Sequence, residues 1–133
     1  MITFVASPTG GHIYPAVACA QELGVSISSF ISVNSPTGSD IISRYGFKCH
    51  AVSPFRSTLY KLPIVTLNLL VHLLLNRPKV LVLCGGYLCV PVGFLAILLR
   101  IPLVILEQNV LPGRANKLFG RFATHFCSSF PST

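Results

Sequence analysis

Short runs of apolar and β-branched residues alternate with longer stretches of helical character along most of the chain. We expect strands at 2–6, 27–33, 47–52, 80–84, 103–106 and 124–127. The run at 80–84 is hydrophobic at every position, which is typical of a parallel strand that is buried on both faces. Glycines or prolines close most of these runs, so the connections between elements are expected to be short.

Five helices are expected between these strands. They lie at 13–23, from Ser39 or Asp40 to Gly46, from Pro63 to before the strand at 80–84, from after Tyr87 to Arg100, and at 112–121. Alternating strands and helices with short links predict βαβ units, which require right-handed crossovers and parallel strands. The sequence therefore predicts one α/β domain over 1–133, a Rossmann-like, doubly wound parallel sheet. In such sheets ligands bind at the carboxyl ends of the strands, where the strand order reverses.

Three polar or glycine-containing turns follow expected strands, after Ala6, after Cys84 and after Leu106. We expect them to converge on one edge of the sheet. The first turn, Ser-Pro-Thr-Gly-Gly-His at 7–12, could offer backbone amides to an anion at a helix N-terminus, although glycine pairs also close ordinary tight turns. It contains neither a Walker A lysine nor a G-x-G-x-x-G pattern, which argues against an NTPase or a nicotinamide enzyme.

His12 stands in the first turn of the expected helix, where the helix dipole disfavours a charged imidazolium. A neutral imidazole there could accept a proton from a hydroxyl, or the ring could simply cap or pack the turn. Gly85, Gly86 and Tyr87 form a similar turn after the fourth strand. Its glycine amides could bind a second anionic group, or the glycines could simply close a tight turn. Glu107, Gln108 and Asn109 follow the fifth strand, and their carboxylate and amide groups suit sugar hydroxyls.

Charge and composition narrow the classes of partner. The chain has 10 Lys and Arg against 3 Asp and Glu, a net charge of +7, and 52% hydrophobic residues, which excludes intrinsic disorder. The cations are scattered without a platform of stacking aromatics, so we do not expect nucleic acid binding. With so few carboxylates, catalysis by a carboxylate pair has almost no candidates. The five cysteines have no C-x-x-C spacing, so we expect reduced thiols and no metal site.

High hydropathy raises the question of a membrane. The apolar run at 64–75 would span about 18 Å as a helix, against a bilayer core of about 30 Å. The run at 87–106 is interrupted by Arg100 and Pro102 and is expected to be a helix followed by a strand. Residues 1–6 lack a basic start, so we expect no secretory signal.

The helix after Pro63 has one narrow polar stripe, Asn68, His72 and Asn76, and is otherwise apolar. A helix that faces a core needs an apolar stripe of only about 100°, so part of this helix should face something else. We expect an anionic membrane surface, because aromatic and basic residues flank the helix. The alternative is cover by another domain or chain. The expected membrane-facing residues are Phe55, Leu59, Tyr60, Leu67, Leu70 and Leu74, and the basic neighbours are Arg56, Lys61, Arg77 and Lys79.

Three segments in order, TGGHIYPAVACAQEL, GGYLCVPVGFLAILLRIPLVI and EQNVLPGRANKLFGRFA, resemble the amino-terminal domain of the MurG family, which has the GT-B fold. The resemblance implies inverting transfer of N-acetylglucosamine from UDP-N-acetylglucosamine to undecaprenyl-pyrophosphoryl-N-acetylmuramoyl-peptide in peptidoglycan synthesis. It implies a peripheral protein on the cytoplasmic face of the inner membrane, with no metal or cofactor. The resemblance covers only the family's amino-terminal domain, and we expect its carboxyl-terminal donor domain to be absent from this chain.

The resemblance also implies residue roles. Thr9, Gly10, Gly11 and Asn109 would meet the donor, and Gly85, Gly86 and Tyr87 would hold the acceptor pyrophosphate. Gln108 is also expected to bind substrate. His12 would be the base, with Glu107 as a possible helper. The sequence departs from the family at Ser7-Pro8, at Val90 and Val92, and at Leu106. We expect no sugar transfer by this chain alone; a non-catalytic membrane subunit that recruits a separate donor-binding chain, or an inactive fragment, are the alternatives.

Overall fold

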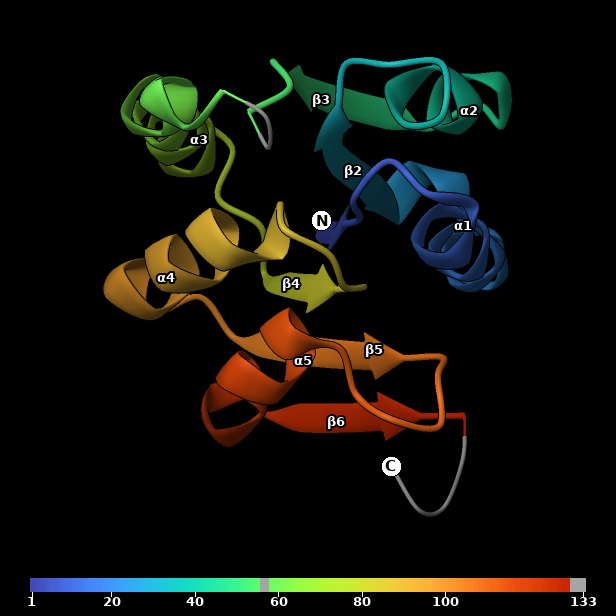
Figure 1. The fold of residues 1–133 in the computed structure, drawn as a ribbon. Coiled ribbons are helices and arrows are strands. Elements are labelled where there is room, and N and C mark those ends of the chain that lie inside the picture. Colours follow the sequence, from blue (N-terminus) through green and yellow to red (C-terminus); the bar gives the residue numbers. More distant parts are fainter. Residues whose placement is uncertain (56–57, 130–133) are drawn as a thin grey trace.

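The computed structural model describes residues 1–55 and 58–129, which form a six-stranded parallel sheet between two layers of helices. The strands are β1 (Ile2–Val5), β2 (Ser28–Val33), β3 (Lys48–Val52), β4 (Val80–Leu83), β5 (Leu103–Glu107) and β6 (His125–Ser128). Their order across the sheet is β3-β2-β1-β4-β5-β6 (Figure 1). The strand order reverses between β1 and β4, which confirms the predicted doubly wound α/β sheet.

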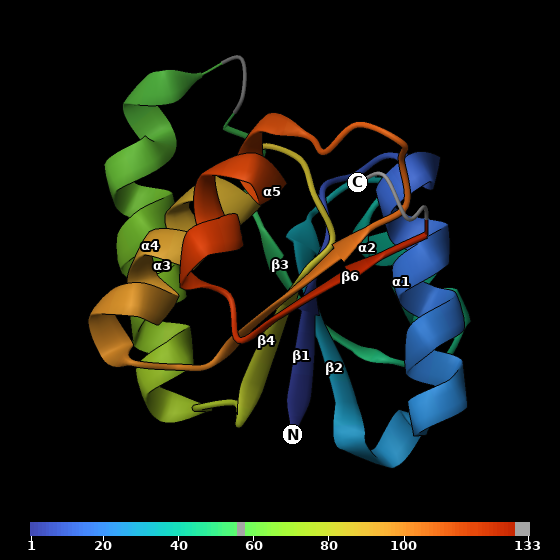
Figure 2. The same cartoon turned by 90° about the horizontal axis from the view of Figure 1, so that it is seen from below.

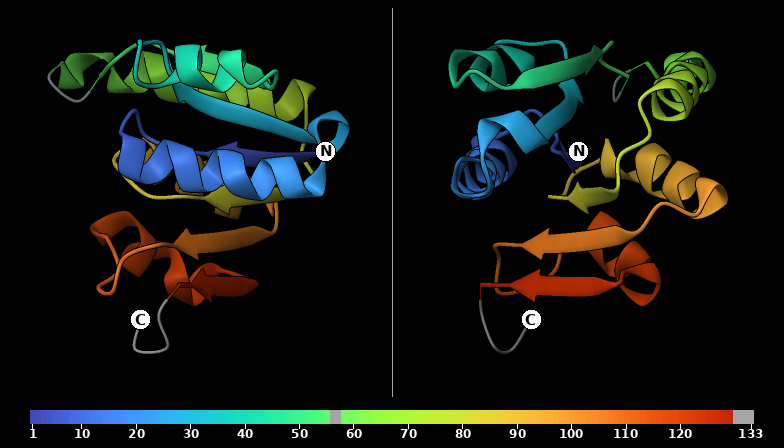
Figure 3. Two further views of the ribbon diagram at one scale, coloured as in Figure 1. Left: turned by 90° about the vertical axis from the view of Figure 1, so that its right-hand side faces the viewer. Right: turned by 180° about the vertical axis from the view of Figure 1, so that it is seen from behind.

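Because strand–helix–strand crossovers are right-handed, the direction in which the chain moves across the sheet decides on which face each helix lies. The helices are α1 (Gly10–Leu23), α2 (Ser39–Arg44), α3 (Leu62–Leu75), α4 (Cys89–Leu99) and α5 (Arg114–Phe119). Seen along the sheet, α1 and α2 lie on one face and α3, α4 and α5 on the other (Figure 2). Figure 3 shows that β5 and β6 have no helix over them on the α1 side, and all four residues of β6 are exposed.

Each face of the sheet has its own core. On the α3–α5 side the fully buried side chains include Leu69, Leu83 and Ile105, and on the α1 side they include Phe4, Ile13 and Phe30. Burial of each such aliphatic or aromatic side chain contributes about 1.5–3 kcal/mol. The strand β4 contributes Leu81 and Leu83 to one core and Val82 to the other, which is why its sequence is apolar throughout.

Several element boundaries differ from the sequence expectation. The chain at Val25–Ile27 forms a 3-10 turn, so β2 begins only at Ser28. The helix expected from Ser39 or Asp40 begins at Ser39, and its N-cap residue is Gly38, so neither Ser39 nor Asp40 caps it. The fifth strand extends to Glu107, and α5 is only six residues long because Gly120–Phe122 forms a 3-10 turn. Across residues 1–55 and 58–129, no helix combines the length and hydropathy needed to cross a bilayer.

Candidate functional site

The three predicted turns meet at the carboxyl edge of the sheet, because β1, β4 and β5 are neighbours with parallel directions. A cavity of about 450 Å³ opens there between the β1–α1 turn, the β4–α4 turn and the start of α5. We call this cavity the cleft. Its lining residues are Ser7, Thr9, His12, Gly86, Tyr87, Val90, Gly113, Arg114 and Ala115.

Glycine is required in the β4–α4 turn because the β1–α1 turn packs directly against it. Gly85 and Gly86 have φ angles of +108° and +91°, which side chains rarely adopt. A Cβ on Gly85 would lie 2.9 Å from Nε2 of His12, and a Cβ on Gly86 would lie 2.2 Å from Oγ of Ser7. The buried Ser7 hydroxyl also accepts a hydrogen bond from the Leu88 backbone N–H at 3.1 Å. These two turns therefore form one unit.

His12 is half-buried at the mouth of the cleft. Its Nδ1 lies 2.8 Å from Oγ1 of Thr9, the N-cap residue of α1, which fixes the ring orientation. Burial lowers the pKa of His12, and the negative charge of Glu107 opposes this shift only in part. A lowered pKa keeps the imidazole neutral near pH 7, and a neutral imidazole can accept a proton.

Glu107 is buried and is surrounded by hydrogen-bond donors from its own loop. Its carboxylate accepts hydrogen bonds from the backbone N–H of Asn109 (3.0 Å), the backbone N–H of Gly113 (2.8 Å) and Nδ2 of Asn116 (2.9 Å). Burial raises its pKa, but these hydrogen bonds outweigh burial, so the pKa is lowered. The carboxylate thus holds the β5–α5 loop in shape and acts on His12 through its charge.

Gln108 and Asn109, both expected to bind substrate, lie in the β5–α5 loop beside the cleft. The Gln108 amide donates a hydrogen bond to the Gly11 carbonyl, which ties the β5–α5 loop to the first turn of α1. The Gln108 Oε1 atom is buried without a hydrogen-bond partner. Asn109 is exposed at the tip of the loop, and neither residue lines the cleft. Gly10 and Gly11 are also exposed and lie beside the cleft rather than in its lining.

Two residues of the cleft region were missed by the sequence reasoning. Arg114, the first residue of α5, is exposed and lines the cleft, where it is the only arginine or lysine among the described residues. Asn116 is 1% exposed, and its amide donates to Glu107 and to the Leu106 carbonyl. Only their position a few residues after the polar triplet Glu107-Gln108-Asn109 could have indicated a role, because neither residue forms a recognisable motif.

The departures from the family pattern fall in different environments. Val90 lines the cleft together with Tyr87. Val92 does not, because it is fully buried in the core between α4 and the sheet. Leu106 is partly buried and packs against the core on the α1 side. Pro8 precedes the N-cap of α1 and contributes no amide proton.

The expected membrane face is only partly accessible. Leu59, Tyr60, Leu67 and Leu74 are between 58% and 75% exposed. The expectation is wrong for Phe55, which is 3% exposed and packs edge-to-face on Tyr87 with ring centroids 5.0 Å apart.

Other parts of this surface differ from what the sequence predicted. Leu70 is half-buried against the core, so it does not lie on the outer face of α3. Arg56 lies outside the described residues. The sequence reasoning also missed α4, the helix that packs against α3, on which Phe94 and Leu98 are 55% and 71% exposed.

Comparisons with known proteins show to which family the chain belongs. Residues 2–128 match the glycosyltransferase family 28 N-terminal domain. The chain belongs to this family. Curated relatives named UDP-N-acetylglucosamine--N-acetylmuramyl-(pentapeptide) pyrophosphoryl-undecaprenol N-acetylglucosamine transferase include those of Pseudomonas syringae pv. syringae, 31% identical over 99% of this chain, and Carboxydothermus hydrogenoformans, 35% identical over 97%. The chain spans about 40% of the length of these relatives.

Solved structures give the same result for the fold. The crystal structure of Acinetobacter baumannii MurG covers 99% of this chain with a TM-score of 0.85 and 27% identity, and the chain covers 42% of it. A Staphylococcus aureus MnaA structure with UDP covers 95% of the chain with a TM-score of 0.65 at 16% identity, which supports the fold alone. The predicted family and the predicted GT-B amino-terminal domain are confirmed.

Proposed function

We propose that this chain supplies the acceptor-binding and membrane-binding half of an inverting glycosyltransferase. The reaction would transfer N-acetylglucosamine from UDP-N-acetylglucosamine to the lipid-linked acceptor undecaprenyl-pyrophosphoryl-N-acetylmuramoyl-peptide. The observation that carries the proposal is the convergence of two glycine turns and a neutral His12 in one cleft. The curated relatives, whose names give this donor sugar and this lipid acceptor, support the same assignment.

In this proposal His12 takes the proton from the acceptor hydroxyl as that oxygen attacks the sugar. Thr9 orients the ring through the contact to Nδ1, which leaves Nε2 as the nitrogen available to the acceptor. Backbone amides of the glycine turns and the Arg114 guanidinium would stabilise the phosphates, because charge-assisted hydrogen bonds are the strongest available here. The chain would depend on a donor-binding domain, in the same protein or in a separate one, and we expect no transfer without it.

The exposed apolar residues of α3 and α4 support a membrane-docking surface for the lipid acceptor. Leu67 and Leu74 lie on the outer side of α3, and Phe94 and Leu98 lie on the adjacent α4. Aliphatic and aromatic side chains of this kind insert at the boundary between headgroups and acyl chains, while lysine and arginine contact anionic lipids. We propose peripheral binding at the cytoplasmic face of the inner membrane.

A transfer assay tests the catalytic proposal. The chain is mixed with the carboxyl-terminal part of a curated relative, radiolabelled UDP-N-acetylglucosamine and a water-soluble analogue of the acceptor. We expect transfer in the mixture and none with either part alone. His12→Ala should reduce the rate by about 100-fold or more, as expected for loss of a general base. The matched control is His125→Ala, an exposed histidine on β6, which should leave the rate unchanged.

The pH dependence adds a second readout. Because the pKa of His12 is lowered, the basic form persists to lower pH, so the acid limb of kcat/KM should have its midpoint below 6.5. Binding of the acceptor analogue to the chain alone separates the alternatives. Acceptor binding by the chain, together with transfer in the mixture that His12→Ala does not slow, would favour a non-catalytic recruiting subunit. No acceptor binding at all would contradict the proposal.

Vesicle flotation tests the membrane surface. The double variant Leu67→Ser, Leu74→Ser should lose binding to vesicles that contain phosphatidylglycerol, because it removes two exposed apolar side chains. Val25→Ser is the control, since Val25 is also 50% exposed but lies after α1, on the other face of the sheet. Equal flotation of the double variant and the wild type would refute a membrane role for α3.

A further inference from the structure

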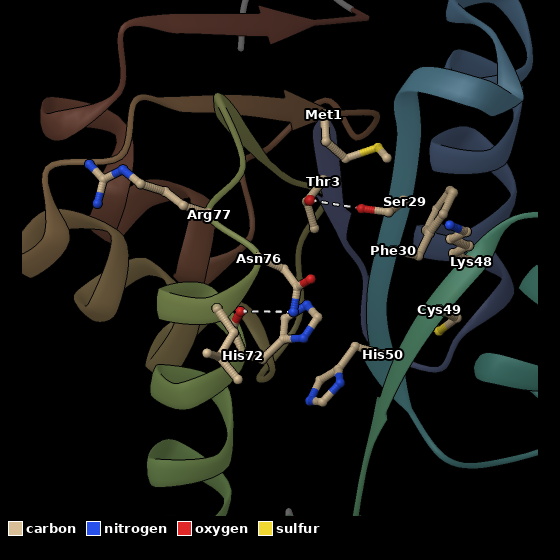
Figure 4. Close-up of a pocket in the computed structure, with 11 residues that line it drawn as sticks. Met1, Thr3, Ser29, Phe30, Lys48, Cys49, His50, His72, Asn76 and Arg77 are labelled. Carbon is tan, nitrogen blue, oxygen red and sulfur yellow. Dashed lines mark hydrogen bonds between the residues drawn. The ribbon is translucent and has the colours of Figure 1, made fainter.

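A second cavity, of about 500 Å³, lies at the amino edge of the sheet, opposite the cleft. It opens between the first residues of β1, β2 and β3 and the end of α3 (Figure 4). We call it the amino-edge cavity. Its lining residues are Met1, Thr3, Ser29, Phe30, Lys48, Cys49, His50, His72, Leu75, Asn76 and Arg77.

The floor of this cavity is a polar row across three strands. Thr3, Ser29 and Lys48 are aligned in register on β1, β2 and β3, so their side chains share one face of the sheet. The Thr3 and Ser29 hydroxyls are hydrogen-bonded at 2.8 Å, and Thr3 is 3% exposed. Only one of the two hydroxyl protons is used in this bond, so the other remains available to a ligand. Apolar residues would be expected on the face of a parallel sheet that a helix covers.

Two histidines form the wall next to this row. His50, two residues after Lys48 on β3, stacks on His72 of α3 with ring centroids 3.9 Å apart and planes 15° apart. Figure 4 shows the two rings side by side. His50 Nε2 lies 2.7 Å from the Asn68 side-chain oxygen, which can only accept, so this nitrogen carries a proton. Asn68 and His72 of the polar stripe of α3 therefore contact His50 of β3, while Asn68 and Asn76 remain exposed.

The charges around the cavity are of one sign. The three acidic residues of the sequence are Glu22, Asp40 and Glu107, and none of them lines the cavity. Lys48 is exposed at the rim. Arg77 adds positive charge nearby, although its guanidinium points away and donates to the Leu99 carbonyl at 2.7 Å.

The remaining titratable groups do not change this balance. Burial raises the pKa of the Cys49 thiol to about 11, so it stays neutral. Burial, together with the charge of His50, lowers the pKa of His72. An anion in the cavity would offset both effects on His72, because it favours the charged imidazolium.

We propose that the amino-edge cavity binds a phosphate-class anion, either a soluble phosphate ester or the phosphate of a lipid headgroup. The Lys48 ammonium and the free hydroxyl proton of the Thr3–Ser29 pair donate to the anion oxygens. One imidazole of the His50–His72 pair takes up a proton when the anion binds. This site is separate from the cleft, because its residues come from the opposite ends of the strands.

The test follows the imidazole resonances of His50 and His72 by NMR while inorganic sulfate or phosphate is added to the whole chain. We expect saturable shifts with a Kd of about 1 mM or below. Lys48→Gln should weaken binding about tenfold, the value of one charge-assisted hydrogen bond. Lys79→Gln is the matched control, since Lys79 is exposed near the same edge but does not line the cavity. Amide spectra confirm that each variant is folded.

Sulfate separates the proton uptake from titration of the ligand, because it stays doubly charged between pH 6 and 8. Wild-type chain should bind sulfate several-fold more tightly at pH 6 than at pH 8, and His72→Gln should lose most of that difference. The absence of saturable shifts in His50 and His72, or equal binding by Lys48→Gln and the wild type, would overturn the proposal.

Vesicles distinguish the two sources of phosphate. If the anion is a lipid headgroup, Lys48→Gln should float less well than Lys79→Gln with phosphatidylglycerol vesicles. If it is a soluble phosphate ester, both variants should float alike while only Lys48→Gln loses sulfate binding. Either result supports an anion site. Neither sulfate binding nor vesicle flotation requires sugar transfer, so the anion site can be tested even if the proposed function is wrong.

Discussion

Replacement of Glu107 by Gln removes one negative charge from a buried loop without changing its size. The carboxylate accepts three hydrogen bonds of 2.8–3.0 Å, two from backbone N–H groups and one from Asn116. Hydrogen bonds to a charged group contribute about 1.5–3 kcal/mol each. Glutamine keeps one acceptor oxygen and turns an amide toward a donor, so we expect one or two of these bonds to be lost. The predicted decrease in the free energy of unfolding is about 2–4 kcal/mol.

Urea unfolding followed by circular dichroism measures this difference at pH 7. The pKa of Glu107 is lowered in the folded state, so its stabilisation is complete above the ordinary value of 4.5 and is lost as the pH falls through the folded value. Wild type and variant should therefore become more alike below pH 4.5. Glu22→Gln is the control, because Glu22 is exposed near the end of α1. A Glu107→Gln variant within about 0.5 kcal/mol of the wild type at pH 7 would refute the argument.

Two further predictions concern packing. Gly86→Ala should lower the melting temperature by several degrees, because the new Cβ would lie 2.2 Å from Oγ of Ser7 at a φ of +91°, whereas Gly11→Ala, with nothing within 4 Å, should not lower it. Differential scanning calorimetry compares the two, and equal melting temperatures would show that the glycine turns are not packed as described. Leu69→Ala, at 0% exposure, should cost about 2–5 kcal/mol in urea unfolding, while Leu74→Ala, at 58% exposure, should cost less than about 0.5 kcal/mol. Similar losses for both would contradict the assignment of the inner and outer sides of α3.

The sequence by itself determined the fold class and the edge of the sheet at which the candidate site lies. Alternation of apolar runs with helical stretches is a local signal, and the carboxyl ends of parallel strands necessarily share one edge. The turns after Ala6, Cys84 and Leu106 could therefore be predicted to converge, and they do. The same local signals misjudged boundaries such as the start of β2, because the ends of elements depend on hydrogen bonds with neighbouring strands.

The tertiary structure alone decided which side chains face which neighbours. Phe55 is an aromatic residue of the kind expected at a membrane surface, but it packs against Tyr87. In the polar stripe of α3, His72 stacks on His50 of β3. The sequence suggested Glu107 as a possible catalytic helper, but its carboxylate accepts hydrogen bonds from backbone N–H groups of its own loop. The physical reason is common to these cases. Periodicity gives the angle of a side chain around its own helix or strand, but the partner at that angle comes from a distant part of the chain.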